Sequence, residues 1–185
     1  GRSKTTVYFH IKNIPLKKKK QTEIREYYRQ QARYLSADRK GKAQRPFKPF
    51  TNWTPESVLL TAHLCFDGEI LKSRCIYNNR SHALLRRFKQ LMELVYDFPP
   101  IERTDAVSGV TRVKYYNVEL QNFLQQKANE LLLTVETLSL DCQREFIRAF
   151  FDDEGCMDFR ADRNQRRVRG YQNDKEILLL MQRLL

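Results

Sequence analysis

The chain is short, basic and moderately apolar. It has 185 residues, 41% of them hydrophobic, which is enough for one sizeable core with an appendage. The formal net charge of +12 favours nucleic acid as a partner over an anionic membrane, since no amphipathic lipid-facing helix accompanies it. No apolar run approaches the roughly 20 residues that span a bilayer, so we expect a soluble, cytoplasmic protein with no membrane partner. The four cysteines have neither metal-ligand nor disulfide-framework spacing, which predicts free thiols.

The positive charge is concentrated at the front of the chain. Residues 1–50 hold 15 basic and 3 acidic residues, whereas the remainder holds 19 of each. Such an asymmetry is typical of a segment that contacts nucleic acid. We therefore expect the front segment to carry much of the attraction for a polyanion, and the rest of the chain to be electrically neutral overall.

Residues 1–36 are predicted to form a basic helical segment. Ser3 can cap a short helix in which Val7, Ile11 and Ile14 recur at helical spacing. The opposite face carries polar groups suited to phosphates and base edges, namely Lys4, Thr5, Tyr8 and Lys12. This pattern is similar to the turn and recognition helix of a helix-turn-helix module, of which it would be a remnant; an ordinary amphipathic helix is the alternative.

Two further features follow in the front segment. A lysine run over residues 17–20 is suited to contact phosphates, and a helix is expected from about residue 21 to 35. Residues 37–51, which contain Gly41, Pro46 and Pro49 among five basic side chains, are predicted to be a linker.

Signals for helix starts and turns become regular from residue 52. Thr54 and Pro55 mark a helix start, and the helix is expected to reach about residue 67. Two short strands, a helix over 81–96, two strands joined at Ser108 and Gly109, and a closing helix complete a unit over residues 52–138. The predicted order is helix, two strands, helix, two strands, helix.

The same order begins again over residues 139–185. A helix ends at Gly155, a hairpin turns near Asn164, and a last helix begins at Asn173 or Asp174. An internal repeat of this kind outweighs other evidence about fold. We therefore expect an α+β protein built from two copies of one unit, the second of them incomplete.

Two of the predicted helices end in similar stretches. These are LTAHLCFDG over residues 60–68 and IRAFFDDEG over residues 147–155, and each has an acid immediately before its final glycine, Asp67 and Glu154. Both stretches resemble the LAGLIDADG pattern of the homing endonucleases, the second more closely than the first, in which His63 and Cys65 occupy unexpected positions. The resemblance covers about residues 52–185.

The resemblance implies a pseudo-twofold fold of αββαββα repeats. In that family the two motif helices pack side by side, with small residues such as Ala62 and Ala149 allowing close approach. Asp67 and Glu154 would then meet as catalytic acids and ligands of Mg²⁺, or of another divalent cation, beneath a bound DNA duplex. Lys127 would be the candidate for the basic residue near the scissile phosphate. A pseudo-symmetric monomer is implied rather than an obligate dimer.

Basic side chains alternate with other residues along the predicted strands. This alternation predicts one apolar and one basic face, and a basic face suits the major groove, where arginine binds guanine through two hydrogen bonds. The candidate DNA-binding residues on these strands are Arg112, Lys114, Arg160, Arg167 and Arg169. His63 is interpreted as a packed or interface histidine and not as a general base.

Three functions are compatible with these features. The first is a metal-dependent, site-specific endonuclease that hydrolyses double-stranded DNA, because both acids are present. The second is a non-catalytic transcription regulator that combines this fold with a helix-turn-helix, since the excess charge lies in the front segment and the first hairpin is short. The third is a maturase for intron RNA, which leaves RNA as an alternative partner.

Overall fold

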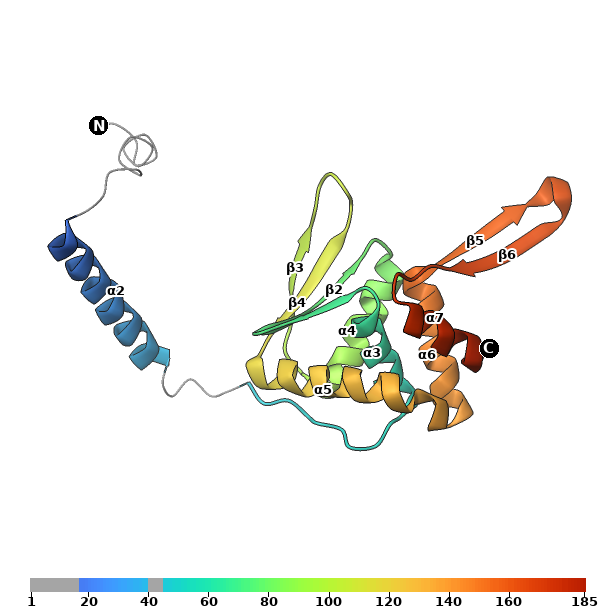
Figure 1. Ribbon diagram of the computed structural model, residues 1–185, viewed down its shortest axis with the longest axis horizontal. Coiled ribbons are helices and arrows are strands. Elements are labelled where there is room, and N and C mark those ends of the chain that lie inside the picture. Colours follow the sequence, from blue (N-terminus) through green and yellow to red (C-terminus); the bar gives the residue numbers. More distant parts are fainter. Residues whose placement is uncertain (1–16, 40–44) are drawn as a thin grey trace. The chain divides into compact units, whose positions relative to one another are not determined.

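The computed structural model describes residues 17–39 and 45–185, which belong to two compact units, 1–44 and 45–185. In the first unit a helix, α2, runs from Lys18 to Arg39 (Figure 1). It is longer than the predicted 21–35 and crosses the boundary placed at residue 36. The expected turn and helix over residues 1–14, with Lys4, Thr5, Tyr8 and Lys12, lie outside the described residues.

The second unit begins inside the segment predicted to be a linker. The backbone N–H of Lys48 donates a hydrogen bond to the carbonyl of Val95 at 2.6 Å. The rings of Phe47 and Phe50 lie 5.4 and 5.1 Å from that of Phe123. Part of the segment predicted to be a linker, residues 45–51, is therefore packed against the core. The reason is that burial of its two phenylalanine rings is favourable.

The first repeat has the predicted order of elements (Figure 1). The helices are α3 (Pro55–Cys65), α4 (His82–Val95) and α5 (Val118–Thr134), followed by a short 3₁₀ turn, η1 (Val135–Thr137). The strands are β1 (Gly68–Leu71), β2 (Arg74–Asn79), β3 (Ile101–Thr104) and β4 (Thr111–Tyr116). They form one antiparallel sheet in the order β1-β2-β4-β3.

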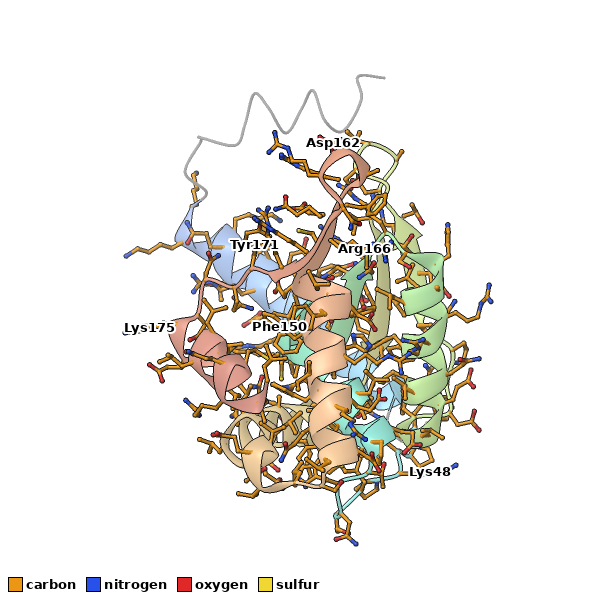
Figure 2. The ribbon with its side chains drawn as sticks, turned by 90° about the vertical axis from the view of Figure 1, so that its right-hand side faces the viewer. Lys48, Phe150, Asp162, Arg166, Tyr171 and Lys175 are labelled. Carbon is orange, nitrogen blue, oxygen red and sulfur yellow. The ribbon has the colours of Figure 1, made fainter. Side chains whose placement is uncertain are left out.

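The second repeat supplies a helix, a hairpin and another helix. These are α6 (Leu140–Glu154), β5 (Gly155–Arg160), β6 (Gln165–Gly170) and α7 (Lys175–Leu184), with a 3₁₀ turn, η2 (Ala161–Arg163), in the hairpin. The hairpin turns near Asn164, as the sequence predicted, and Asn164 adopts the left-handed conformation there, with φ 46°. Figure 2 shows the hairpin rising beyond the end of α6, with Asp162 at its tip.

Side-chain caps fix where the helices begin. Thr54 accepts a hydrogen bond from the N–H of Ser57, and the Ser57 hydroxyl accepts one from the N–H of Thr54, which is a complete capping box. The remaining N-caps of this unit are Ser81, Asn117, Ser139 and Asp174. Within the described ranges, no helix combines the length and apolar character needed to cross a membrane.

The core is organised around the contact between α3 and α6. Both helices are buried along their shared side, where Ala62 and Ala149 are fully inaccessible to solvent. Small side chains let two helix backbones approach closely, as the family resemblance implied. Phe66 bridges the pair, with its ring 5.5 Å from that of Phe146 and 5.4 Å from that of Phe150.

The close approach can be tested by enlarging one of the alanines. Ala149→Leu should destabilise the protein by about 1–3 kcal/mol, because extra methylene groups in a filled contact force side chains out of their rotamers. Denaturant unfolding followed by circular dichroism measures the change. Arg144→Leu is the matched control on the exposed side of α6, and an equal loss in both variants would contradict this account.

Candidate active site

Two acids lie at corresponding ends of the paired helices. Asp67 follows α3 and precedes Gly68, and Glu154 ends α6 before Gly155. A Cβ on Gly68 would lie 2.4 Å from the Leu64 backbone, and one on Gly155 would lie 2.2 Å from the Phe151 carbonyl oxygen. Glycine is required at both places because each strand leaves its helix directly against the preceding turn.

Each acid accepts a hydrogen bond from a side-chain amide. Asn79 Nδ2 donates to Asp67 Oδ2 at 2.9 Å, and Gln172 Nε2 donates to Glu154 Oε1 at 3.2 Å. Gly68 pairs with Tyr77 in the first hairpin and Gly155 with Gly170 in the second. Asn79 lies two residues after Tyr77, and Gln172 lies two residues after Gly170. The two amides therefore occupy equivalent positions, and the two halves of the site have the same arrangement.

The acids are close enough to repel each other. The pKa of Asp67 is raised to about 7, first by burial and then by the charges of Asp153 and Glu154. The pKa of Glu154 is also raised, by burial and by Asp153, while the hydrogen bond from Gln172 opposes the rise. The helix end adds partial negative charge at the same place. The repulsion therefore favours either protonation of these carboxylates or binding of a cation between them.

The two other acids at the end of α6 already have partners. Asp152 Oδ2 lies 3.2 Å from Arg87 Nη1 and 3.8 Å from Arg148 Nε. The Asp153 side chain is fully buried and accepts hydrogen bonds from His63 and Tyr77. Within the described part of the chain, Asp67 and Glu154 form no salt bridge. They are therefore the carboxylates left to bind an added cation.

Lys127 lies in a separate environment on α5. Its ammonium is 2.9 Å from Glu130 Oε2 and lies over the rings of Trp53 and Phe50, at 5.0 and 5.4 Å from their centroids. Trp53 Nε1 donates to Glu130 Oε1 at 3.1 Å, which closes the cluster. The structure does not bring Lys127 together with Asp67 and Glu154, and its catalytic role stays a prediction.

The first sheet has one buried and one solvent-facing side. On β4, Thr111, Val113 and Tyr115 are buried, whereas Arg112 and Lys114 face outward. The pairing register adds basic residues from β2 and β3 to that outer side. We call this surface the first basic face, and it comprises Arg74, Arg103, Arg112 and Lys114. Three of these residues also line a cavity of about 360 Å³ near the β3–β4 turn.

The second hairpin repeats this arrangement. Cross-strand pairing places Cys156 beside Arg169, Asp158 beside Arg167 and Arg160 beside Gln165, so these six residues share one side. Counting from the two glycines, Arg167 corresponds to Arg74 of the first sheet. We call this surface the second basic face, and it comprises Arg160, Arg167 and Arg169. Asp158 forms a salt bridge with Arg169 on it.

The opposite side of the second hairpin is apolar and exposed. Met157, Phe159 and Val168 leave 77, 60 and 60% of their surface accessible, and Arg166 lies over the Phe159 ring. The predicted division into a basic and an apolar face is thus present in both sheets. Figure 1 shows the β3–β4 and β5–β6 hairpins projecting from the same side of the helices.

The oxygen donors of the acid pair fit a divalent cation. Magnesium prefers oxygen ligands and is usually bound by one or two carboxylates, with water and phosphate supplying the rest. In the described ranges, no group of three or more His, Cys, Asp or Glu residues could hold a metal ion by itself. Asp67 and Glu154 could therefore supply two carboxylate ligands of such a cation, with water completing its coordination.

Several residues of the site were not singled out from the sequence. Asn79 and Gln172 carry no motif, but their equivalent distances from the two glycines could have revealed them. Tyr77 and Asp153 contribute through contacts between segments distant in the sequence, which no local pattern indicates. His63 is buried against Asp153, which confirms its interpretation as an interface residue.

Comparison with known proteins identifies the fold. No family model and no curated protein matches the sequence. Among solved structures, mesophilic variants of the homing endonuclease I-DmoI are 16% identical to this chain, with a TM-score of 0.51, over 70% of this chain and 74% of theirs. I-DmoI in complex with DNA and Mn gives the same identity and TM-score over 70 and 75%. The chain has the α+β fold of a homing endonuclease.

The raised pKa of Asp67 predicts a pH-dependent stability without metal. The folded protein retains this proton up to about pH 7, whereas the unfolded chain releases it near pH 4. Between these values the folded state binds more protons, so the free energy of unfolding falls as pH rises. Asp67→Asn should therefore raise the thermal midpoint at pH 8 in chelator and have little effect at pH 4. A lower midpoint at pH 8 would contradict the repulsion described above.

Proposed function

We propose that this chain is a DNA-binding endonuclease that uses a divalent cation to hydrolyse phosphodiesters. The observation that supports this function is the position of Asp67 and Glu154 at the adjoining ends of α3 and α6, where neither forms a salt bridge with a described residue. One basic face lies on the four-stranded sheet of the first repeat and the other on the β5–β6 hairpin of the second. I-DmoI, which has the same fold, has been solved with DNA and Mn. Magnesium is the cation we expect in the cell.

The two basic faces would hold the duplex. Their arginine and lysine side chains neutralise phosphates, and arginine can also read guanine in the major groove. On the first basic face, the Arg74 guanidinium lies over the Tyr116 ring, 5.8 Å from its centroid. We propose DNA contacts for Arg112, Lys114, Arg160, Arg167 and Arg169, and for the front residues Lys4, Thr5, Tyr8 and Lys12.

The acids would bind the cation next to the bound phosphates. Asp67 and Glu154 supply the carboxylate oxygens, while Asn79 and Gln172 hold these carboxylates in orientation. A bound divalent cation stabilises negative charge on phosphate and lowers the pKa of bound water. Binding requires ionised carboxylates, so it displaces the proton that Asp67 otherwise keeps below about pH 7. Equivalent halves offer one acid to each DNA strand.

A transcription regulator is the second candidate. The observation that favours it is the location of the charge, since the excess of basic residues lies within residues 1–50. Those residues would anchor the chain on DNA without any need for cleavage. Both candidates predict binding, and they differ in whether the acid pair acts on the bound duplex.

Cleavage separates the two candidates. The full chain is incubated with Mg²⁺ and a library of supercoiled plasmids carrying randomised inserts, and nicked and linear products are quantified. Wild-type protein should cut a subset of inserts. Asp67→Asn and Glu154→Gln should each reduce the rate by more than about 100-fold, because even the outer partners of a metal commonly contribute 10–100-fold.

Glu145→Gln is the matched control for these variants. It makes the same chemical change on α6, at a residue that pairs with Arg148 and lies away from the acid pair. It should cleave at the wild-type rate. If the wild-type protein binds inserts from the library but cleaves none of them, the transcription regulator is favoured and the endonuclease is overturned.

The second basic face can be tested with two neighbouring arginines. Arg167 and Arg166 are adjacent on β6 but lie on opposite sides of the hairpin. Arg167→Ala should lower DNA affinity and reduce the slope of log K against log salt by about 0.9, the value for one lost phosphate contact. Arg166→Ala should leave the slope unchanged. Equal effects in a fluorescence anisotropy titration would show that the face is misassigned.

A further inference from the structure

A buried polar cluster crosses the contact between α3 and α6. Asp153 Oδ2 accepts a hydrogen bond from His63 Nδ1 of α3 at 2.8 Å, and Asp153 Oδ1 accepts one from the Tyr77 hydroxyl of β2 at 2.6 Å. The side chains of His63 and Asp153 are fully inaccessible to solvent. The cluster therefore ties α6 to two elements of the first repeat at the residue immediately before Glu154.

The cluster continues to the other acid. Asn79 Nδ2 lies 3.2 Å from the Tyr77 hydroxyl oxygen and 2.9 Å from Asp67 Oδ2, and it donates to both. A chain of hydrogen bonds thus runs from Asp153 through Tyr77 and Asn79 to Asp67. Burial and the charge of Asp153 raise the pKa of Tyr77, so its hydroxyl stays protonated and acts as a donor.

The equivalent place on the other side of the contact is apolar. Phe150 occupies the motif position of His63, and Phe66 that of Asp153; their rings lie 5.4 Å apart. Gly170 replaces Tyr77, and a Cβ there would lie 2.2 Å from the Phe150 ring. An aromatic pair thus fills the same space without any polar group.

Packing alone does not account for the polar side. Burying a carboxylate costs free energy unless donors satisfy it, and an apolar replacement of such a pair is often neutral or stabilising. The Phe66–Phe150 contact shows which apolar replacement this fold accommodates. The hydrogen bonds of Asp153 must therefore have a role other than close packing. They connect Asp153 to Asp67, and Asp153 is the residue next to Glu154.

We propose that Tyr77 and His63 are positioning residues for the acid pair, acting through Asp153 and Asn79 to fix Glu154 and Asp67 relative to each other. This inference rests on the proposed function, because the relative position of Asp67 and Glu154 matters only if the two acids bind one cation site together. Outer-shell hydrogen bonds of this kind orient metal-binding carboxylates. Neither residue touches substrate or cation itself.

Tyr77→Phe is the sharpest test. It removes only the hydroxyl that links Asp153 to Asn79, and the ring can stay stacked on Phe88, 4.4 Å away. Mn²⁺ binding to the full chain is measured by isothermal titration calorimetry at pH 8. We expect the affinity of the variant to fall about 10–100-fold, as for other outer-shell partners of a metal.

Tyr96→Phe is the matched control. Tyr96 is also buried, and its hydroxyl donates to the Tyr116 carbonyl at 3.4 Å; among the described residues, no hydrogen bond connects it to the acids. This variant should bind Mn²⁺ like the wild type, because it removes no hydrogen bond of the buried polar cluster. Equal affinities in both variants would overturn the positioning role, whereas wild-type protein that binds no Mn²⁺ would overturn the proposed function.

A metal-free experiment tests the inference independently of cation binding. A double-mutant cycle combines Tyr77→Phe with Asp67→Asn, and urea midpoints are measured in chelator. Because the two residues are joined through Asn79, the shift in the double variant should differ from the sum of the single shifts. The cycle of Tyr96→Phe with Asp67→Asn should be additive. Additivity in both cycles would overturn the inference even if the chain cleaves DNA.

Discussion

The close contact between α3 and α6 is the constraint on which the rest of the structure depends. Two helices that each end in a carboxylate are brought together side by side, although their charges and their dipoles repel at the shared end. Ala62 and Ala149 make the approach sterically possible, and the core behind them supplies the free energy. The repulsion that remains falls on Asp67 and Glu154, and it is what makes this place suitable for a cation.

The neighbouring acids show how the charge is distributed. Asp152 is offset by two arginines and Asp153 by buried donors, so that two of the four carboxylates are satisfied within the protein. The remaining two accept one amide hydrogen bond each, which orients them without neutralising them. Stability and function therefore make opposite demands within a few residues, since a cationic partner for Asp67 would strengthen the fold but compete with a metal ion.

Much of the architecture could be predicted from the sequence because its signals are local. Thr54 with Pro55 marks a helix start, and Gly109 and Asn164 mark turns. Alternation separates basic from buried side chains on β4 and places Arg167 and Arg169 on one side of β6. The two acids followed from a motif with a fixed spacing to glycine. Each of these signals depends on neighbours within a few positions, where backbone geometry restricts the choices.

The remaining features depend on contacts that no local pattern specifies. The partners His63 and Asp153 are 90 positions apart, and Tyr77 and Asp153 are 76 apart. Residues 45–51 have the composition of a linker, yet Phe47 and Phe50 pack on a helix formed much later in the chain. Lys127 has a basic side chain on the expected helix, but its surroundings are set by Trp53 and Glu130. Periodicity indicates which face is buried and not what covers it.

The contact between α3 and α6 is polar on one side, at His63 and Asp153, and aromatic on the other, at Phe66 and Phe150. This difference also determines which halves can associate. Two copies of the first half would place His63 opposite Phe66, and the imidazole would lose its acceptor. Two copies of the second half would bury Asp153 against Phe150 with no donor, a loss of the kind that costs about 3–5 kcal/mol when a buried ion pair is broken. Each half thus disfavours a copy of itself and accepts the other, so the two repeats associate as unlike partners although they share one order of elements.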